Sequence, residues 1–172
     1  MATHLFVIIA SGLDAEDSYE DRLFDAGCDD ATVAWQKGAM ILEFDREATS
    51  FSQAVASACH DVRSAGAIVE RVEPDHLVSL SDIAERAGIT RQAAALYSTG
   101  ERGRGFPHPV ARVTSKTPLW DWVDVATWLH DHGRLSEETV TEARVVRAAN
   151  LLMERGSASP DALTGELERV RA

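Results

Sequence analysis

Apolar and polar positions divide the first 74 residues into six predicted elements. The nearly continuous apolar run from His4 to Ala10 is long enough for a buried central strand and too short for most helices. Residues at helical spacing predict helices over 14–26 and 50–65. Shorter apolar or alternating runs predict strands over 31–36, 39–45 and 67–72. The order is therefore strand, helix, strand, strand, helix, strand.

Turn and cap signals mark the ends of these elements. Lys37-Gly38 separates two of the strands and predicts a hairpin. Ser50 and Gln53 have the spacing of a capping box at the start of the second helix, and Gly66 ends that helix. This order of elements is that of a ferredoxin-like βαββαβ sandwich. We expect it over residues 1–74, as a regulatory or pairing domain.

Two short helices joined by a tight turn are predicted after residue 77. Ser81 can cap the first helix, Gly88 supplies the permissive backbone of the turn, and Thr90 can cap the second helix. Thr90, Arg91 and Gln92 then lie at the exposed start of the second helix. This is the layout of a helix-turn-helix. The residues expected to point inward are Ile83, Ala84, Ala87, Ala94 and Tyr97.

Further residues follow this helix pair at a distinctive spacing. Phe106-Pro107-His108-Pro109-Val110 precedes an expected β-hairpin, and Leu119-Trp120, Val125 and Trp128-Leu129 come after it. With the helix pair, these residues resemble the excisionase and prophage-regulator (AlpA-type) group of small MerR-like winged helix-turn-helix DNA-binding proteins. The resemblance runs from Leu80 to Leu129, less than a third of the chain. It implies that the aromatic rings of Trp120, Trp122 and Trp128 pack against the helix-turn-helix.

The net charge opposes DNA binding, but its distribution does not. The 172 residues include 17 Lys and Arg against 28 Asp and Glu, a net charge of -11, and an acidic chain repels phosphate. The window from Arg86 to Lys116, however, holds six cations and one anion, so it carries +5 and the remainder carries -16. A cationic segment in an acidic protein is where a nucleic-acid surface is expected. Ordinary solvated arginines are the alternative.

The residues of this window have separate expected roles. Arg91 can bond the two major-groove acceptors of guanine, and Gln92 can pair with adenine. Thr90 and the free amides at this helix end suit a phosphate. Arg102 and Arg104 lie in a glycine-rich loop that either contacts phosphate or the minor groove, or is a flexible connection. On the expected wing, the groups that would hold the DNA backbone are Arg112, Ser115 and Lys116.

Helices are also predicted over the carboxy-terminal part of the chain. Asp121 can cap a helix that runs to about His130. Residues 136–155 carry an apolar stripe that is either a dimer seam or packs on the chain's own domains, and Ser159-Pro160 begin the last helix. We therefore predict an α+β protein of three segments: a ferredoxin-like domain over 1–74, a MerR-like winged helix-turn-helix over 77–133, and a helical tail, a candidate dimerisation element, over 134–172.

No stretch of the chain assembles an acid, a base and a binding loop. Cys59 and His60 are adjacent on a helix and point about 100 degrees apart, so they cannot act as a thiol and its base. His130 and His132 fall at a helix end, where free carbonyls favour histidine, so a metal site is the weaker interpretation. We expect no enzyme activity, no cofactor and no metal, and we expect Cys28 and Cys59 to be buried thiols.

The expected function is sequence-directed DNA binding by a bacterial transcriptional regulator of the prophage-control or antitoxin type. Its partners would be double-stranded DNA and, because Ala93 and Ala95 leave few base-reading side chains, a second copy of the chain. The alternative is a protein-interaction adaptor whose acidic amino-terminal domain and tail bind a partner protein. That domain could also take a small-molecule effector. No apolar run reaches the ~18 residues of a membrane helix, so we expect a cytoplasmic protein.

Overall fold

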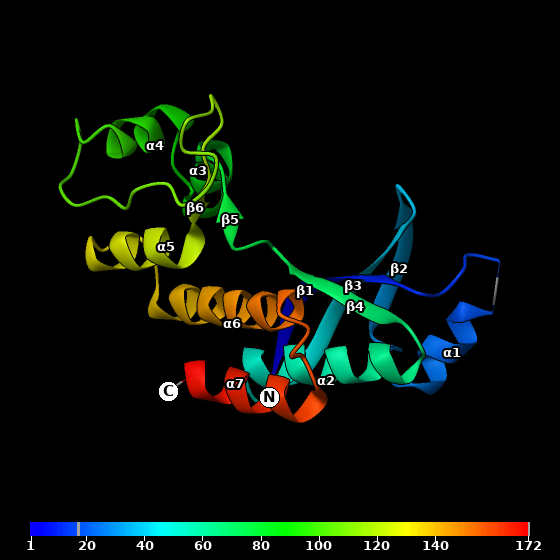
Figure 1. The fold of residues 1–172 in the computed structure, drawn as a ribbon. Coiled ribbons are helices and arrows are strands. Elements are labelled where there is room, and N and C mark those ends of the chain that lie inside the picture. Colours follow the sequence, from blue (N-terminus) through cyan, green and yellow to red (C-terminus); the bar gives the residue numbers. More distant parts are fainter. Residues whose placement is uncertain (17, 172) are drawn as a thin grey trace. The chain divides into compact units, whose positions relative to one another are not determined.

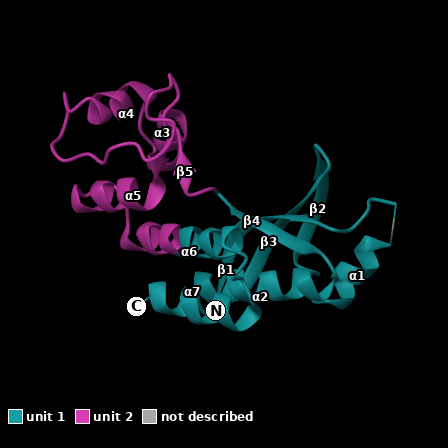
Figure 2. Cartoon of the chain, viewed as in Figure 1, with its two compact units in different colours: residues 1–74, 145–172 teal, residues 75–144 magenta. Residues whose placement is uncertain are grey.

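The computed structural model describes residues 1–16 and 18–171 as a mixture of helices and antiparallel strands (Figure 1). The α+β class predicted from the sequence is confirmed. The chain divides into two compact units, residues 1–74 with 145–172 and residues 75–144 (Figure 2). Residues 134–172, predicted as one tail, are thus divided between the units. Within the described ranges, no helix is long and apolar enough to cross a membrane.

The first unit contains a four-stranded antiparallel sheet and the helices that pack on it. The strands lie where the apolar patterns predict them, some with longer ends. The first helix begins at Tyr19 and not at residue 14, since bends and turns follow the first strand; residue 17 lies outside the described residues. The elements are β1 (Ala2–Ser11), α1 (Tyr19–Asp25), β2 (Ala31–Gln36), β3 (Ala39–Ala48), α2 (Phe51–Ser64), β4 (Ile68–Glu73) and α7 (Pro160–Arg171).

Strand β1 lies inside the sheet, whose order is β2-β3-β1-β4. Ile8 of β1 is opposite Leu42 of β3 and Val72 of β4, and all three side chains are fully buried. Because alternate residues of a strand point to opposite faces, the burial pattern assigns one face of the sheet to the core. Helix α7 packs against α2, and the core residues that α2 contributes include Ala54, Val55, Ala58 and Val62.

The start of α2 differs from the predicted capping box. Ser50 is the N-cap, and its Oγ accepts a hydrogen bond from the Gln53 amide at 3.2 Å. The Gln53 side chain, however, accepts hydrogen bonds from the amide and the hydroxyl of Thr49, at 3.0 and 2.6 Å. Because Thr49 offers two donors, it replaces the Ser50 amide as the partner of Gln53, and the cap extends one residue towards the amino terminus.

Helix α6 (Glu137–Glu154) begins in the second unit and ends in the first, where it closes one edge of the sheet. Asn150 is 1 % exposed. Its Oδ1 accepts a hydrogen bond from the Val72 amide at 2.8 Å, and its Nδ2 donates to the Val72 carbonyl at 2.9 Å. The Asn150 side chain thus bonds the backbone donor and acceptor that a neighbouring strand would otherwise bond at this point of β4. Of the two alternatives for the apolar stripe, the part from residue 145 onward therefore packs on the chain's own sheet.

The second unit combines two short helices, a two-stranded antiparallel sheet and longer helices. Its core contains the residues expected to point inward, including Ile83, Ala94 and Tyr97, together with the three tryptophans. Trp120, Trp122 and Trp128 are buried, as predicted. Besides the start of α6, the elements are β5 (Leu77–Val78), α3 (Leu80–Ala87), α4 (Arg91–Ser98), β6 (Trp120–Asp121) and α5 (Trp122–Asp131).

The prediction of Ser81 as the cap of the first helix in this unit is wrong. Helix α3 is capped by Ser79, which forms a reciprocal capping box with Asp82. Asp82 lies three residues after Ser79 and can return a hydrogen bond, whereas the residue three positions after Ser81 is Ala84. The earlier serine therefore makes the stronger cap.

The hairpin expected between Val110 and Leu119 is also reduced. Only one bridge forms there in the described chain, between Ala111 and Leu119. Bends and turns occupy most of the residues between them, and Arg112 has a positive φ of 52°. Because this conformation interrupts an extended strand, the expected wing is a loop closed by one bridge.

Candidate nucleic-acid interface

The turn between α3 and α4 exposes the first residues of α4. Gly88 adopts the left-handed conformation (φ 63°) that ends α3, and Thr90 is extended. The Thr90 hydroxyl accepts a hydrogen bond from the Ala93 amide at 3.1 Å, which confirms its predicted role as the N-cap. Thr90, Arg91 and Gln92 are all exposed. This helix end therefore presents a cation and an amide to solvent on consecutive residues.

A hydrogen bond across the turn orients Arg91. Its Nε donates to the Ser81 hydroxyl in the first turn of α3, at 3.1 Å. Ser81 can accept this bond because Ser79 has taken the capping role. The bond uses Nε and leaves Nη1 and Nη2, which carry N–H groups that can reach a guanine edge. Sequence reasoning missed Ser81 as a positioning residue, since the cap prediction had already assigned its hydroxyl.

The glycine-rich loop after α4 is fixed by its backbone. The Trp128 indole donates a hydrogen bond to the Arg104 carbonyl at 2.9 Å, and the Arg102 amide donates to the Leu96 carbonyl at 3.0 Å. Gly103 lies so close to Trp128 that a Cβ at this position would be 2.9 Å from the ring. These contacts do not fit a flexible connection, which was one of the two alternatives for this loop.

Aromatic rings of the core pack against the glycine-rich loop. The guanidinium of Arg102 lies 5.7 Å from the centroid of the Tyr97 ring. Tyr97 contacts Phe106 and Trp128, with ring centroids 6.0 and 5.1 Å apart. The loop therefore rests on the core of the unit, while the side chains of Arg102 and Arg104 are exposed.

The residues predicted to hold the DNA backbone from the wing lie in the loop closed by the Ala111–Leu119 bridge. Arg112, Ser115 and Lys116 are all exposed. The amide and the hydroxyl of Ser115 both donate to the Arg112 carbonyl, at 2.9 and 2.8 Å, so Ser115 shapes the turn. The two cationic side chains point to solvent from this turn and do not extend a strand, which corrects the expected wing geometry.

Five of the six cations in the window form no ion pair with any described residue. They are exposed, so their charge is available to an anionic partner: Arg91, Arg102, Arg104, Arg112 and Lys116. Arg86 differs, because it is partly buried and its guanidinium lies 5.4 Å from the centroid of the Trp122 ring. It belongs to the core of the unit and not to the exposed cationic surface.

The cysteines and histidines that the sequence singled out make local contacts within their own units. Cys28 and Cys59 are buried, as predicted, and burial raises the pKa of each thiol to about 12. His130 and His132 contact the carbonyls of Leu135 and Trp128 through Nδ1, at 2.9 and 2.7 Å. In the part of the chain that the structure describes, no group of His, Cys, Asp and Glu side chains could hold a metal ion.

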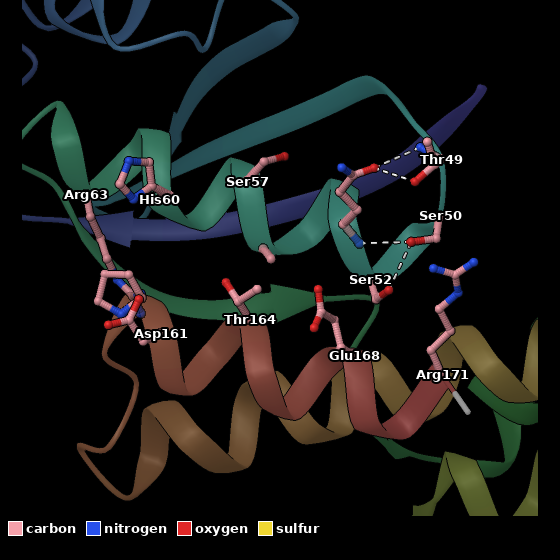
Figure 3. A pocket seen from close by; sticks show the side chains of 13 residues that line it. Thr49, Ser50, Ser52, Ser57, His60, Arg63, Asp161, Thr164, Glu168 and Arg171 are labelled. Atoms are coloured by element: carbon pink, nitrogen blue, oxygen red, sulfur yellow. Dashed lines mark hydrogen bonds between the residues drawn. The ribbon is translucent and has the colours of Figure 1, made fainter.

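A groove of about 470 Å³ lies between α2 and α7 of the first unit (Figure 3). His60 and Arg63 line it from α2, and Asp161 and Glu168 line it from α7. The Nη1 of Arg63 is buried and has no hydrogen-bond partner among the described residues. Hydroxyl groups also line the groove, from Thr49, Ser50, Ser52, Ser57 and Thr164. Hydroxyls together with both signs of charge are groups that orient small polar ligands.

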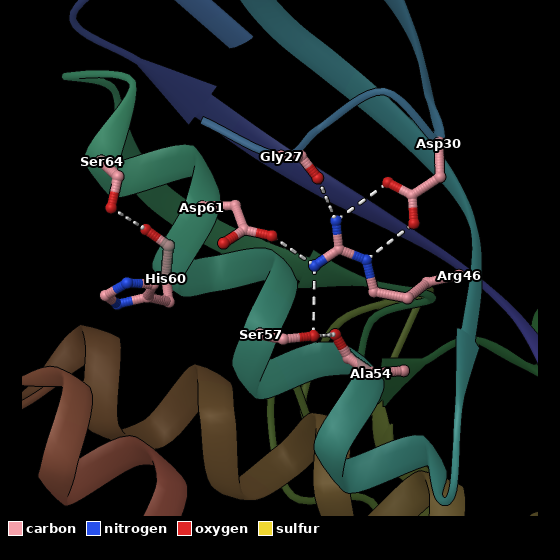
Figure 4. A network of polar contacts seen from close by, with 8 residues as sticks. All are labelled: Gly27, Asp30, Arg46, Ala54, Ser57, His60, Asp61 and Ser64. Carbon is pink, nitrogen blue, oxygen red and sulfur yellow. Dashed lines mark hydrogen bonds and ion pairs between the residues drawn. The ribbon is translucent and has the colours of Figure 1, made fainter. Parts of the chain in front are cut away.

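A second polar cluster in the first unit surrounds Arg46 (Figure 4). Arg46 is 6 % exposed and donates two hydrogen bonds to Asp30, one to Asp61, one to Ser57 and one to the Gly27 carbonyl, all between 2.7 and 3.1 Å. Burial acts to lower the pKa of Arg46, but the hydrogen bonds to both carboxylates raise it above its ordinary value. Arg46 pairs with both carboxylates and ties β3 to α2, so we interpret this cluster as structural. Alternation along β3 places Arg46 on the core face, but the sequence names none of its partners.

Comparison of the chain with protein-family models, curated proteins and solved structures found no significant match.

Proposed function

We propose that residues 75–144 form a MerR-like winged helix-turn-helix that binds double-stranded DNA in a sequence-directed manner, and that the chain is a bacterial transcriptional regulator. The observation that carries the proposal is the exposed pair Arg91 and Gln92 in the first turn of α4, with Arg91 oriented by Ser81. An oriented guanidinium loses less side-chain entropy when it bonds a base edge. Gln92, next in the chain, supplies the amide that suits adenine.

The loop and the turn would supply contacts to the DNA backbone. Arg102 and Arg104 extend from a loop that Trp128 holds in place, and Arg112 and Lys116 extend from the turn closed by the Ala111–Leu119 bridge. Each cation that neutralises a phosphate releases about 0.9 of a counterion, so these contacts would make binding strongly dependent on salt. They fix the position of the protein on the duplex and read no sequence.

The base-reading surface is small, which favours a dimer. Ala93 and Ala95 are partly buried and carry no polar side-chain atoms. Two readers on one helix discriminate only modestly, so two copies on adjacent half-sites would be needed for a specific operator. We therefore propose that the chain binds DNA as a homodimer.

The first unit is proposed to be ferredoxin-like and to have a regulatory or pairing role. Its support is the antiparallel order β2-β3-β1-β4, with α1 between β1 and β2 and α2 between β3 and β4. The groove between α2 and α7 is where a small polar effector would bind.

Selection of bound fragments from random DNA at about 150 mM salt tests the proposed function, since non-specific electrostatic binding is weak there. The expected result is enrichment of one motif with two-fold symmetry. Weak binding to every fragment without enrichment would contradict sequence-directed binding.

The second candidate function is that of a protein-interaction adaptor. The net charge of -11 and the acidic residues of the first unit favour it, because they repel DNA and attract a basic partner. Purification of the chain with one dominant partner protein and without DNA would support the adaptor over the regulator.

A further inference from the structure

The two edges of the sheet in the first unit differ. Strand β4 is covered at Val72 by the side chain of Asn150. Strand β2 lies at the opposite edge, and its neighbour in the sheet is β3 (Figure 1). Alternate residues of β2 remain only partly buried, whereas Leu42 on the adjacent strand is fully buried. An uncovered edge strand offers a row of backbone donors and acceptors to another strand.

The hairpin geometry identifies the backbone groups that β2 leaves open. Gln36 and Ala39 pair across the two-residue turn Lys37-Gly38, so Gln36 and alternate residues before it bond β3. The hydrogen bond from the Asp45 amide to the Asp30 carbonyl fits this alternation. The residues whose backbone groups point away from β3 are therefore Ala31, Val33 and Trp35, although the Ala31 amide bonds the Cys28 carbonyl.

We propose that β2 pairs antiparallel with β2 of a second copy of this chain, which joins the two sheets into one continuous sheet. If the helix-covered faces of the two copies lie on the same side, core-facing residues must oppose core-facing residues. The register that meets this condition and pairs Ala31, Val33 and Trp35 together has its two-fold axis beside Val33, with Trp35 opposite Ala31 of the other copy. Val33 would exchange both backbone hydrogen bonds with its counterpart, and the small side chain of Ala31 leaves room for the indole.

Charge complementarity favours this register. Strand β2 contains no charged residue, although the chain carries -11 overall. Its ends are flanked by Asp29 and Lys37, which are exposed and form no ion pair with a described residue. Asp29 and Lys37 lie in the turns just beyond the two ends of β2. In the register centred on Val33, the turn with Asp29 in each copy meets the turn with Lys37 in the other, which brings two opposite-charge pairs together. A second copy of this chain therefore matches the opposite charges at the two ends of β2. A partner strand with charges of one sign would match only one of these ends.

This interface lies within the first unit and goes beyond the proposed function, because it forms without DNA. Its formation is measured by the mass of the full chain in sedimentation equilibrium between about 1 and 100 µM, without nucleic acid. The dimer mass is expected in this range. A monomer mass throughout would overturn the interface and leave the test of DNA selection unaffected.

Val33→Pro tests the backbone pairing. Proline removes the Val33 amide, which makes no hydrogen bond to β3, so the edge strand can accept it. The variant is expected to be monomeric and to keep the circular dichroism spectrum of the parent. A Val33→Pro dimer as tight as the parent would overturn the proposal.

Charge reversal tests the register without altering the backbone. Lys37→Glu and Asp29→Lys are each expected to weaken the dimer about 10-fold, through loss of two attractions and gain of two repulsions. The double variant should regain most of this loss, since the opposite-charge pairs are restored. Arg155→Glu, an exposed charge reversal just after α6 and outside both proposed sites, should leave the dimer unchanged. Single variants that dimerise like the parent, or a double variant that is no tighter than the singles, would refute this register.

Discussion

The hydrogen bond between Ser81 and Arg91 joins α3 and α4 across the turn from Gly88 to Thr90. Arg91 is the side chain proposed to read a base. Ser81 orients Arg91 through this bond without contacting the base. Because a single hydrogen bond of this kind contributes about 1 kcal/mol, its loss is measurable as a change in selectivity.

Ser81→Ala is expected to lower the preference for the selected operator over random DNA about 5-fold, since the Arg91 guanidinium loses its orientation. The free energy of unfolding should change little because the cap of α3 is Ser79. Competition binding measures the preference, and urea unfolding measures stability. Ser98→Ala, which removes a hydroxyl that bonds the Ala95 carbonyl, is the control. Equal preference in the parent and Ser81→Ala would show that this bond has no role in recognition.

Burial of Cys28 and Cys59 predicts a pH dependence of stability. Each thiol has a pKa raised from 9.0 to about 12 in the folded chain. Above about pH 9 the unfolded chain loses these protons and the folded chain keeps them, so the free energy of unfolding should fall as the pH rises from 9 towards 12. Below pH 9 the thiols should contribute no slope. Urea unfolding over this range, with Cys59→Ala as the variant of reduced slope, measures the effect. An identical slope in both proteins would contradict it.

At the level of elements, the loop between α4 and the Phe-Pro-x-Pro segment owes its shape to Trp128. The indole bonds the Arg104 carbonyl, and the ring leaves no room for a side chain at Gly103. The Trp120 indole donates in the same way to the Pro107 carbonyl, at 3.1 Å. Two core tryptophans thus fix the chain on both sides of Phe106, so the direction in which Arg102 and Arg104 leave the surface is set by the core.

Gly103→Ala is expected to weaken binding to all DNA sequences about equally and to lower the dependence of log affinity on log salt by up to about two. The Cβ would force the loop away from Trp128 and displace Arg102 and Arg104. Gly100→Ala is a matched control, because Gly100 has nearly the same φ, 76° against 75°, and nothing within 4 Å of its Cβ position. Salt titrations of DNA binding by both variants measure this dependence. Equal slopes in the two variants would contradict a role for the fixed loop.

The limits of sequence reasoning are clearest at particular elements. The strands of the first unit and their hairpin at Lys37-Gly38 could be predicted, because burial follows the alternation of side chains along each strand. The cap of α3 was misplaced, since Ser79 and Ser81 are both plausible caps and only Ser79 has a carboxylate three residues later. The role of Asn150 could not be predicted, because its partner Val72 is 78 residues away. A helical stripe shows that a face is buried, but not against what.

For the whole molecule, the division into two units assigns the cationic window from Arg86 to Lys116 and the β2 edge to different parts of one chain. The exposed cations of the window all belong to residues 75–144, and the uncovered edge of β2 belongs to the first unit. DNA contact and self-association are therefore proposed for separate units. Substitution of the DNA-contacting side chains should leave the mass of the dimer without DNA unchanged, whereas loss of the dimer should weaken discrimination between operators.

The most direct test of the central claim compares Arg91→Ala with Arg104→Ala on the selected operator and on random DNA, in electrophoretic shifts between about 50 and 200 mM salt. Arg91→Ala is predicted to lose about 10-fold or more of the discrimination between the two DNAs, because it removes a base contact. Arg104→Ala is predicted to weaken both about equally and to lower the salt slope by roughly one, because it removes a phosphate contact. Two variants that bind both DNAs like the parent would show that the exposed start of α4 and the loop after it are not a DNA-binding surface.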